Sequence, residues 1–298
     1  MSRRATALAT ILRLFEKPKL ARIQSVPHQR RRFEFQSRLF RPTKGPVDRR
    51  EEIGGIACLR ILPQTPARAR LLYIHGGAYI MGSIRTHRAL ARHLAAQLQV
   101  EVVLPDYRLA PEHPFPAAFD DVLAVAEALP DDLPLLLMGD SAGGGLCLSL
   151  LSALCLAGKP PHAAVALSPW TDLALTGESL NTNARTEAML PASRIGEVRD
   201  WYLGGAAKTD PKASPLYADF PNCPPVLIQY SESEILADDA RRMAAHLTEQ
   251  GAEVALEGWP GMVHVWQLFH GVLPEADAAL ARVADFVAAQ FGRPDTTR

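Results

Sequence analysis

The chain alternates short apolar runs with longer segments in which apolar residues recur every three or four positions. The short runs predict strands and the periodic segments predict helices. Runs such as 102–104 and 135–138 are apolar on both faces, which is typical of parallel strands covered by helices. This alternation predicts an α/β fold with a mostly parallel sheet. The expected strands are 55–61, 70–75, 100–104, 134–138, 163–168, 225–230 and 253–257, and the expected helices are 86–98, 116–129, 142–157, 236–250 and 275–291.

Two segments do not follow this alternation. Residues 1–50 hold 14 Lys and Arg but only three acidic residues, a net charge of +11, although the whole chain is balanced. Residues 169–222 are rich in proline, with one expected helix at 193–203. Long irregular segments in compact domains are usually lids or binding loops, and open α/β sheets bind ligands at the carboxyl ends of their strands. We therefore predict a helical cap, built from residues 1–50 and an insertion at about 170–210, over a catalytic domain of residues 51–298.

A candidate nucleophile follows the expected strand 134–138. The sequence Gly139-Asp140-Ser141-Ala142-Gly143 lies between that strand and a helix, which is the setting of a G-x-S-x-G nucleophile elbow. The motif alone is a weak signal, because small residues also form strand–helix turns that cradle phosphate. In the elbow interpretation, Ser141 is the nucleophile.

A second motif follows the expected strand 70–75. The residues His75-Gly76-Gly77-Ala78 form a small-residue loop, and such a loop lets backbone N–H groups approach a reacting carbonyl. Donors of this kind stabilise the oxyanion of acyl transfer, and loss of one costs about 10²–10³ in rate. Ala142 supplies a further N–H at the start of its helix, so Gly76, Gly77, Ala78 and Ala142 are the candidate oxyanion-hole residues.

A nucleophilic serine needs a base, and the base needs a carboxylate that orients it. In a G-x-S-x-G fold the acid and then the histidine follow the serine along the chain. His264 lies on a Gly/Pro-rich loop after the last expected strand and is the candidate base, whereas His246 and His270 fall on expected helices as packing residues. Glu234 comes directly after a strand and is the first candidate acid. Asp238 is the second.

These motifs together resemble the hormone-sensitive lipase family of esterases, bacterial family IV, within the α/β-hydrolase superfamily. The resemblance covers about residues 70–270. Its most specific part is the stretch DYRLAPEHPFPAA at 106–118, which composition or fold alone would not produce. The stretches SPWTD at 168–172 and SPLY at 214–217 are also similar to the family.

The resemblance implies an α/β-hydrolase fold with a helical cap, Ser141 as nucleophile and His264 as general base. The oxyanion hole that it implies uses the amides of Gly77, Ala78 and Ala142, with Gly76 shaping the turn. The chain departs from the family in two places. Ala78 replaces the usual third glycine, and Glu234 stands where the family commonly has aspartate; glutamate is chemically sufficient, but the identity of the acid stays open.

The expected function is that of a serine carboxylesterase that hydrolyses short-to-medium-chain acyl esters through an acyl-enzyme. The chemistry needs no metal or organic cofactor, and the balanced charge does not favour nucleic acid as a partner. An N-acyl amidase or deacetylase, or a lactone hydrolase, would use the same triad. A non-catalytic small-molecule receptor of this superfamily would lack the histidine, and His264 is present. A homodimer is expected only by analogy.

The four cysteines, Cys58, Cys147, Cys155 and Cys223, show no metal-binding spacing, and we expect free thiols in a reducing compartment. Charged residues interrupt the N-terminal apolar stretch, so no secretory signal is expected. No window approaches 18 apolar residues, so no membrane span is expected either. Together these features predict a cytoplasmic protein.

One amphipathic pattern near the N-terminus allows two interpretations. Leu8, Ile11, Leu12 and Phe15 are spaced i, i+3, i+4 and i+7 among basic residues. Such a helix could lie on an anionic membrane surface, or it could cover the active site as part of the cap. We prefer the cap interpretation.

Overall fold

The computed structural model describes residues 1–22 and 25–292, and eight strands within these ranges form one sheet. In chain order the strands are β1 (Val47–Ile53), β2 (Ile56–Leu62), β3 (Arg70–Ile74), β4 (Glu101–Pro105), β5 (Leu135–Asp140), β6 (Ala163–Leu167), β7 (Val226–Ser231) and β8 (Val254–Trp259). Across the sheet they lie in the order β1-β2-β4-β3-β5-β6-β7-β8. β2 is antiparallel to β1 and β4. The remaining strands, β4, β3, β5, β6, β7 and β8 in sheet order, are parallel to one another. The predicted α/β fold with a mostly parallel sheet is confirmed.

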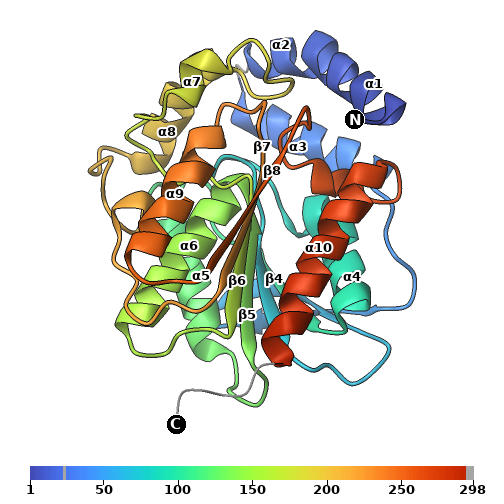
Figure 1. Cartoon of the computed structure of the whole chain (residues 1–298), viewed down its shortest axis with the longest axis vertical. Helices are drawn as coiled ribbons and strands as arrows, with labels where there is room; N and C mark the ends of the chain where they lie inside the picture. The colour runs from blue at the N-terminus through green and yellow to red at the C-terminus, as the bar shows by residue number, and fades with distance from the viewer. Residues whose placement is uncertain (23–24, 293–298) are drawn as a thin grey trace.

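Helices cover both faces of this sheet (Figure 1). α4 (Ile84–Leu98) and α10 (Pro274–Phe291) pack on one face, and α5 (Ala117–Ala128), α6 (Ser141–Leu156) and α9 (Ala237–Glu249) pack on the other. The other helical segments are α1 (Arg3–Ile11), the π-helical turn η1 (Leu12–Glu16), α2 (Lys17–Leu20), α3 (Val26–Gln36), η2 (Ser37–Leu39), α7 (Ser179–Thr182), η3 (Ala192–Arg194), α8 (Ile195–Leu203), η4 (Pro215–Tyr217) and η5 (Trp266–Phe269).

The inner strands are buried along their whole length because helices cover both of their sides. Every residue of β3, β4, β6 and β7 is buried, which explains why these strands appear in the sequence as continuous apolar runs. β8 lies at an edge of the sheet, and its residues are partly buried or exposed. The predicted strands and helices are all present, with ends that differ by at most two residues.

Strand β1 is not among the predicted elements. Its sequence, Val-Asp-Arg-Arg-Glu-Glu-Ile, lacks the apolar character of the inner strands, because β1 is an edge strand and most of its side chains are exposed. It forms a hairpin with β2. The sheet therefore begins at Val47, inside the segment 1–50 that we assigned to the cap, and the boundary predicted at residue 51 falls within this strand.

The two segments predicted to form the cap do lie together, at one end of the molecule (Figure 1). The Lys17 ammonium donates to the carbonyls of Ala184 and Glu187, at 2.8 and 2.9 Å, and so joins the N-terminal helices to the insertion. Leu8 and Leu12 pack against a buried cluster on the catalytic domain. Within the described ranges, none of the helices combines the length and the apolar character that crossing a bilayer requires.

Candidate active site

Ser141 lies at the sharp turn between β5 and α6. Its backbone has a φ of +54°, in the left-handed region that non-glycine residues seldom adopt. The turn fits only because position 143 lacks a side chain: a Cβ on Gly143 would lie 2.2 Å from the carbonyl oxygen of Ile74. Strained backbone of this kind gathers at functional sites, and here the close approach of helix and strand fixes the direction of the serine hydroxyl.

Ser141, His264 and Glu234 form a continuous hydrogen-bonded chain. Nε2 of His264 lies 2.8 Å from Oγ of Ser141, and Nδ1 lies 2.6 Å from Oε2 of Glu234. All three side chains are buried. With a carboxylate at Nδ1, the ring carries its proton there and leaves Nε2 free to accept the proton of the serine hydroxyl.

Neighbouring loops hold this chain in place from β7 and β8. The Ser231 hydroxyl at the end of β7 donates to the carbonyl of Met262 at 2.6 Å, which joins the acid loop to the histidine loop. The Ser231 amide donates to Oε1 of Glu234 at 3.1 Å. Because β7 and β8 are adjacent and parallel, the acid and the histidine leave the same edge of the sheet.

The other candidate residues lie elsewhere. Asp238 is in the first turn of α9, where it accepts from the Ser179 amide at 2.8 Å and pairs with Arg241 at 3.2 Å. His246 contacts the Ala218 carbonyl and His270 contacts the Arg41 carbonyl. Of the two candidate acids, the structure thus brings Glu234 to His264.

The loop after β3 presents free backbone donors near Ser141. Gly77 has a φ of +127°, and a Cβ there would lie 2.2 Å from the carbonyl oxygen of Met81. In the part of the chain that the structure describes, no acceptor takes the N–H groups of Gly77 and Ala78. Ala142 lies in the first turn of α6, where N–H groups have no partner within the helix. The Gly76 amide, by contrast, donates to Asp140 at 3.0 Å and so shapes the turn.

Asp140 holds the loop after β3 in place. Its carboxylate accepts from the Tyr73 hydroxyl at 2.8 Å as well as from Gly76, and it lies 3.3 Å from Nε2 of His87. Burial alone would raise the pKa of Asp140, but the nearby His87 ring and the Tyr73 hydroxyl hold it below its usual value. The charged carboxylate therefore fixes the position of the Gly76 amide.

Arg30 of cap helix α3 is a residue that the sequence did not single out. Its guanidinium donates to the carbonyls of Ile80 and Ala110, each at 2.7 Å, and pairs with Glu112 at 2.6 Å. Arg30 thus links Glu112 to the loop after β3, whereas Arg108 pairs with Asp121 at 2.6 Å.

Glu187, in the cap insertion, is a second residue that the sequence did not reveal. Its buried carboxylate accepts from the amides of Met189 and Leu190, at 2.7 and 3.1 Å, and from the amide of Ile235 at 3.2 Å. Burial raises the pKa of Glu187, and the nearby His264 opposes the rise. This carboxylate joins the cap to the residue that follows Glu234.

A small cavity of about 70 Å³ opens beside Ser141 between the cap and the catalytic domain. It is lined by Leu20, Ala78, Ile80, Met81, Trp170, Leu190, Pro191, Arg194, Ile195, Val198, Ile235 and Leu236. Tyr79, on the same loop as Ala78, stacks on Tyr202 with ring centres 3.7 Å apart. The walls of this cavity are mostly apolar.

His75 is a packing residue rather than a ligand. Its ring stacks on Tyr107 with centres 4.3 Å apart and on His87 at 5.3 Å. Burial and the neighbouring His87 lower the pKa of His75 to about 3. In the described ranges, no three His, Cys, Asp or Glu side chains gather as a metal site would require.

The charge of Glu234 predicts the pH dependence of activity. Burial is the largest single influence and acts to lower the pKa of His264. The hydrogen bond and charge of Glu234, with the charges of Glu187 and Asp140, together outweigh it, so the pKa lies above its ordinary value. Only neutral His264 can accept a proton, so activity is lost as pH falls through this pKa. We expect the acidic limb of kcat/KM to have its midpoint above about 6.5, and to move to lower pH in Glu234→Gln. A wild-type midpoint at or below that of free histidine would contradict this account.

The elbow, the hydrogen-bonded Ser–His–Glu chain and the parallel sheet define a serine hydrolase of the α/β-hydrolase class. A family model described as alpha/beta hydrolase fold matches residues 71–268. The chain belongs to the hormone-sensitive lipase family of esterases within this superfamily.

Three relatives illustrate the similarity. The chain is 40% identical over 227 residues to an acetyl-hydrolase of Streptomyces hygroscopicus, with 74% of this chain and 76% of the relative covered. It is 37% identical to a crystal structure of an esterase from the bacterial hormone-sensitive lipase family, with a TM-score of 0.89 and coverage of 98% and 99%. The crystal structure of EstE5 soaked with ethyl alcohol is 34% identical, with a TM-score of 0.93 and coverage of 98% and 100%.

Proposed function

We propose that the protein is a serine carboxylesterase that hydrolyses short-to-medium-chain acyl esters, with the shortest acyl groups preferred. The observation that carries this proposal is the chain of short contacts from Ser141 through His264 to Glu234, 2.8 and 2.6 Å long. A serine next to a neutral imidazole is an activated nucleophile.

In the proposed mechanism, Ser141 attacks the ester carbonyl while Nε2 of His264 takes the hydroxyl proton. Glu234 holds the ring and stabilises the imidazolium that forms. The carbonyl oxygen becomes an oxyanion, which the amides of Gly77 and Ala78 and the helix-terminal amide of Ala142 stabilise. His264 then protonates the departing alcohol, and water repeats the sequence on the acyl-enzyme.

The size of the cavity supports the preference for short acyl groups. Its volume of about 70 Å³ has room for only a few heavy atoms, and its walls come from both the cap and the catalytic domain. The similar Streptomyces hygroscopicus protein is named an acetyl-hydrolase, which agrees with a small acyl site. We propose that the cap, formed by the N-terminal helices and the insertion, sets this limit.

A series of p-nitrophenyl esters from acetate to palmitate tests the proposed substrate class. We expect kcat/KM to be highest for acetate or butyrate and to fall at least tenfold by the octanoate, because a longer chain has to displace cap residues. The matched p-nitroanilides and a simple lactone, measured with the same enzyme, separate an esterase from an amidase or lactonase. Highest activity on palmitate would contradict the proposed acyl site, and activity on the anilides alone would contradict the proposed reaction.

A further inference from the structure

The first N-terminal helix exposes one apolar face to solvent. Leu8 and Leu12 pack against the catalytic domain, but Ile11, Leu14 and Phe15 are 54%, 62% and 60% exposed. These three residues lie at the end of α1 and in the π-helical turn η1 that continues it. The amphipathic pattern is thus divided, with one part serving the cap and the other part left uncovered.

The neighbouring helix carries a second exposed pair. Phe35 at the end of α3 and Leu39 in η2 are 67% and 80% exposed. Glu16 accepts hydrogen bonds from Arg32 and Gln36, so η1 and α3 lie side by side. Both exposed sets therefore belong to adjoining helical segments.

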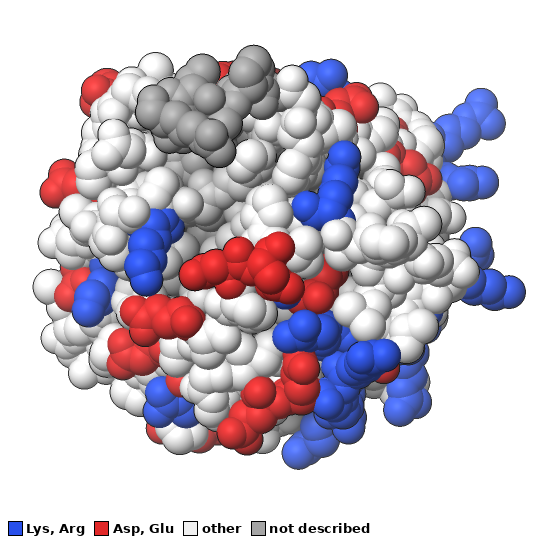
Figure 2. Space-filling view, turned by 90° about the horizontal axis from the view of Figure 1, so that it is seen from below, with Lys and Arg blue, Asp and Glu red and all other residues white. Residues whose placement is uncertain are grey.

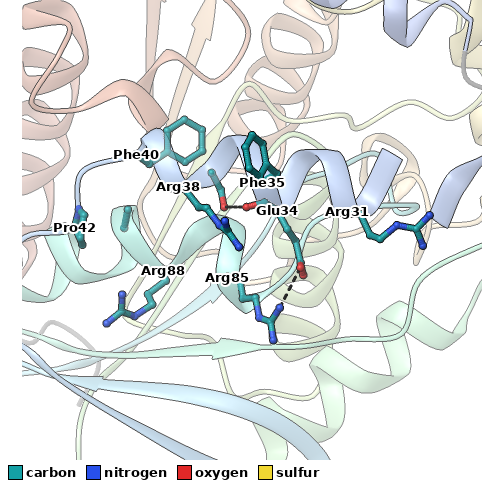
Figure 3. Close-up of a pocket in the computed structure, with 10 residues that line it drawn as sticks. Arg31, Glu34, Phe35, Arg38, Phe40, Pro42, Arg85 and Arg88 are labelled. Carbon is teal, nitrogen blue, oxygen red and sulfur yellow. Dashed lines mark hydrogen bonds and ion pairs between the residues drawn. The ribbon is translucent and has the colours of Figure 1, made fainter. Parts of the chain in front are cut away.

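A basic cavity of about 550 Å³ adjoins the exposed pair. It lies between α3, η2 and the start of α4, away from Ser141, and Figure 3 shows the arginine side chains that project from these helices. The lining residues that matter here are Arg31, Glu34, Phe35, Arg38, Arg85 and Arg88.

The cavity carries positive charge that the described residues do not neutralise. Arg85 pairs with Glu34 at 3.3 Å and Arg88 pairs with Asp48. Arg31 and Arg38 form no ion pair within the described ranges, and Arg38 lies over the Phe35 ring. The surrounding segment 1–50 has a charge of +11, balanced by −11 on the rest of the chain. Figure 2 shows, from the end opposite the cap, that basic side chains also gather along one side of the molecule.

We propose that the surface formed by Phe35, Leu39 and the basic cavity docks on a membrane that contains anionic phospholipid. Lipid phosphates enter the cavity and bind Arg31 and Arg38, because a guanidinium offers two parallel donors to a phosphate. Phe35 and Leu39 enter the interfacial layer, as apolar side chains of surface-bound helices do. In a symmetric dimer built on this surface, each copy would present the same positive charge to the other and be repelled, whereas an anionic lipid surface is complementary to it.

Vesicle co-sedimentation tests the arginine cavity. We expect the wild type to sediment with vesicles of equal parts phosphatidylcholine and phosphatidylglycerol, and to stay in solution with phosphatidylcholine alone. The double variant Arg31→Gln/Arg38→Gln should bind the mixed vesicles roughly 10- to 30-fold more weakly, because each basic side chain near an anionic surface contributes to binding. The matched control is Arg49→Gln/Arg50→Gln, which removes the same charge from exposed positions on β1 outside the cavity. It should bind nearly as well as wild type.

The apolar pair gives an independent test with unchanged charge. We expect Phe35→Ala/Leu39→Ala to weaken vesicle binding while hydrolysis of p-nitrophenyl acetate without vesicles, and the unfolding temperature, stay at wild-type values. Equal losses in the two arginine variants would reject the cavity in favour of general charge attraction. Release of the wild type by inorganic phosphate at constant ionic strength would assign the cavity to a free anion, and a wild type that does not sediment would overturn the proposal.

Discussion

Replacing Ser141 with alanine is expected to lower kcat on p-nitrophenyl acetate by about 10⁶-fold, the scale seen when a catalytic serine is removed. Without Oγ, neither the acyl-enzyme nor the proton transfer to His264 can occur. The measurement is the initial rate of p-nitrophenol release, together with the unfolding temperature to show that the variant is folded.

The matched control is Ser152→Ala on the same helix, whose hydroxyl donates to the Asp219 carbonyl at 2.7 Å. This change should leave kcat within a few-fold of wild type. A Ser141→Ala enzyme that is folded and retains more than a few per cent of wild-type activity would contradict the proposed nucleophile.

Replacing Glu234 with alanine is expected to lower kcat by roughly 10³–10⁴-fold, because the histidine loses the carboxylate that orients its ring and stabilises the imidazolium. Asp238→Ala is the matched comparison. It removes a carboxylate four positions later that contacts Ser179 and Arg241 instead of His264, and it should keep most of the activity.

Both variants are measured under the same conditions as wild type, with the unfolding temperature recorded for each. If Asp238→Ala loses activity while Glu234→Ala keeps it, Glu234 is not the acid of the triad. Equal large losses with unchanged folding would mean that the orienting charge is shared between the two positions.

Apolar patterning predicted most of the fold because buried strands and helix faces consist mainly of apolar residues. β3, β4, β6 and β7 are buried along their whole length, so most of their residues are apolar. The buried charges of Arg70 and Glu101 pair with each other at 2.6 Å. β1 could not be predicted in this way because it is an edge strand, where charged residues occupy most positions. The inner strands could be predicted from the sequence because buried positions favour apolar side chains, and not from strand propensity alone.

The sequence also predicted several features of the site. The nucleophile elbow could be recognised partly from the glycine at position 143, which is needed because no Cβ fits beside the carbonyl of Ile74. The order of the serine, acid and histidine along the chain, each after a strand, places Ser141 and His264 at the same edge of a parallel sheet. Strand order therefore determined which loops could meet.

Only the tertiary structure decided which side chains do meet. Glu234 and Asp238 are four residues apart, but the turn before α9 directs the first toward His264 and the second toward Ser179 and Arg241. Such a choice depends on side-chain directions within a few ångströms, which local sequence does not encode.

The contacts between the cap and the catalytic domain are the second feature that the tertiary structure decided. Arg30 reaches Ile80, 50 residues away, and Glu187 reaches Ile235, 48 residues away. Nothing in the sequence close to Arg30 or Glu187 indicates these distant partners. The sequence by itself determined the sheet, the elbow and the chemical groups of the site, because burial and close approach restrict residue type. The meeting of the loops after β7 and β8 determined the acid, and the long-range packing of the cap on the catalytic domain determined the acyl cavity and the contacts of the oxyanion loop, because these depend on where distant segments come to lie.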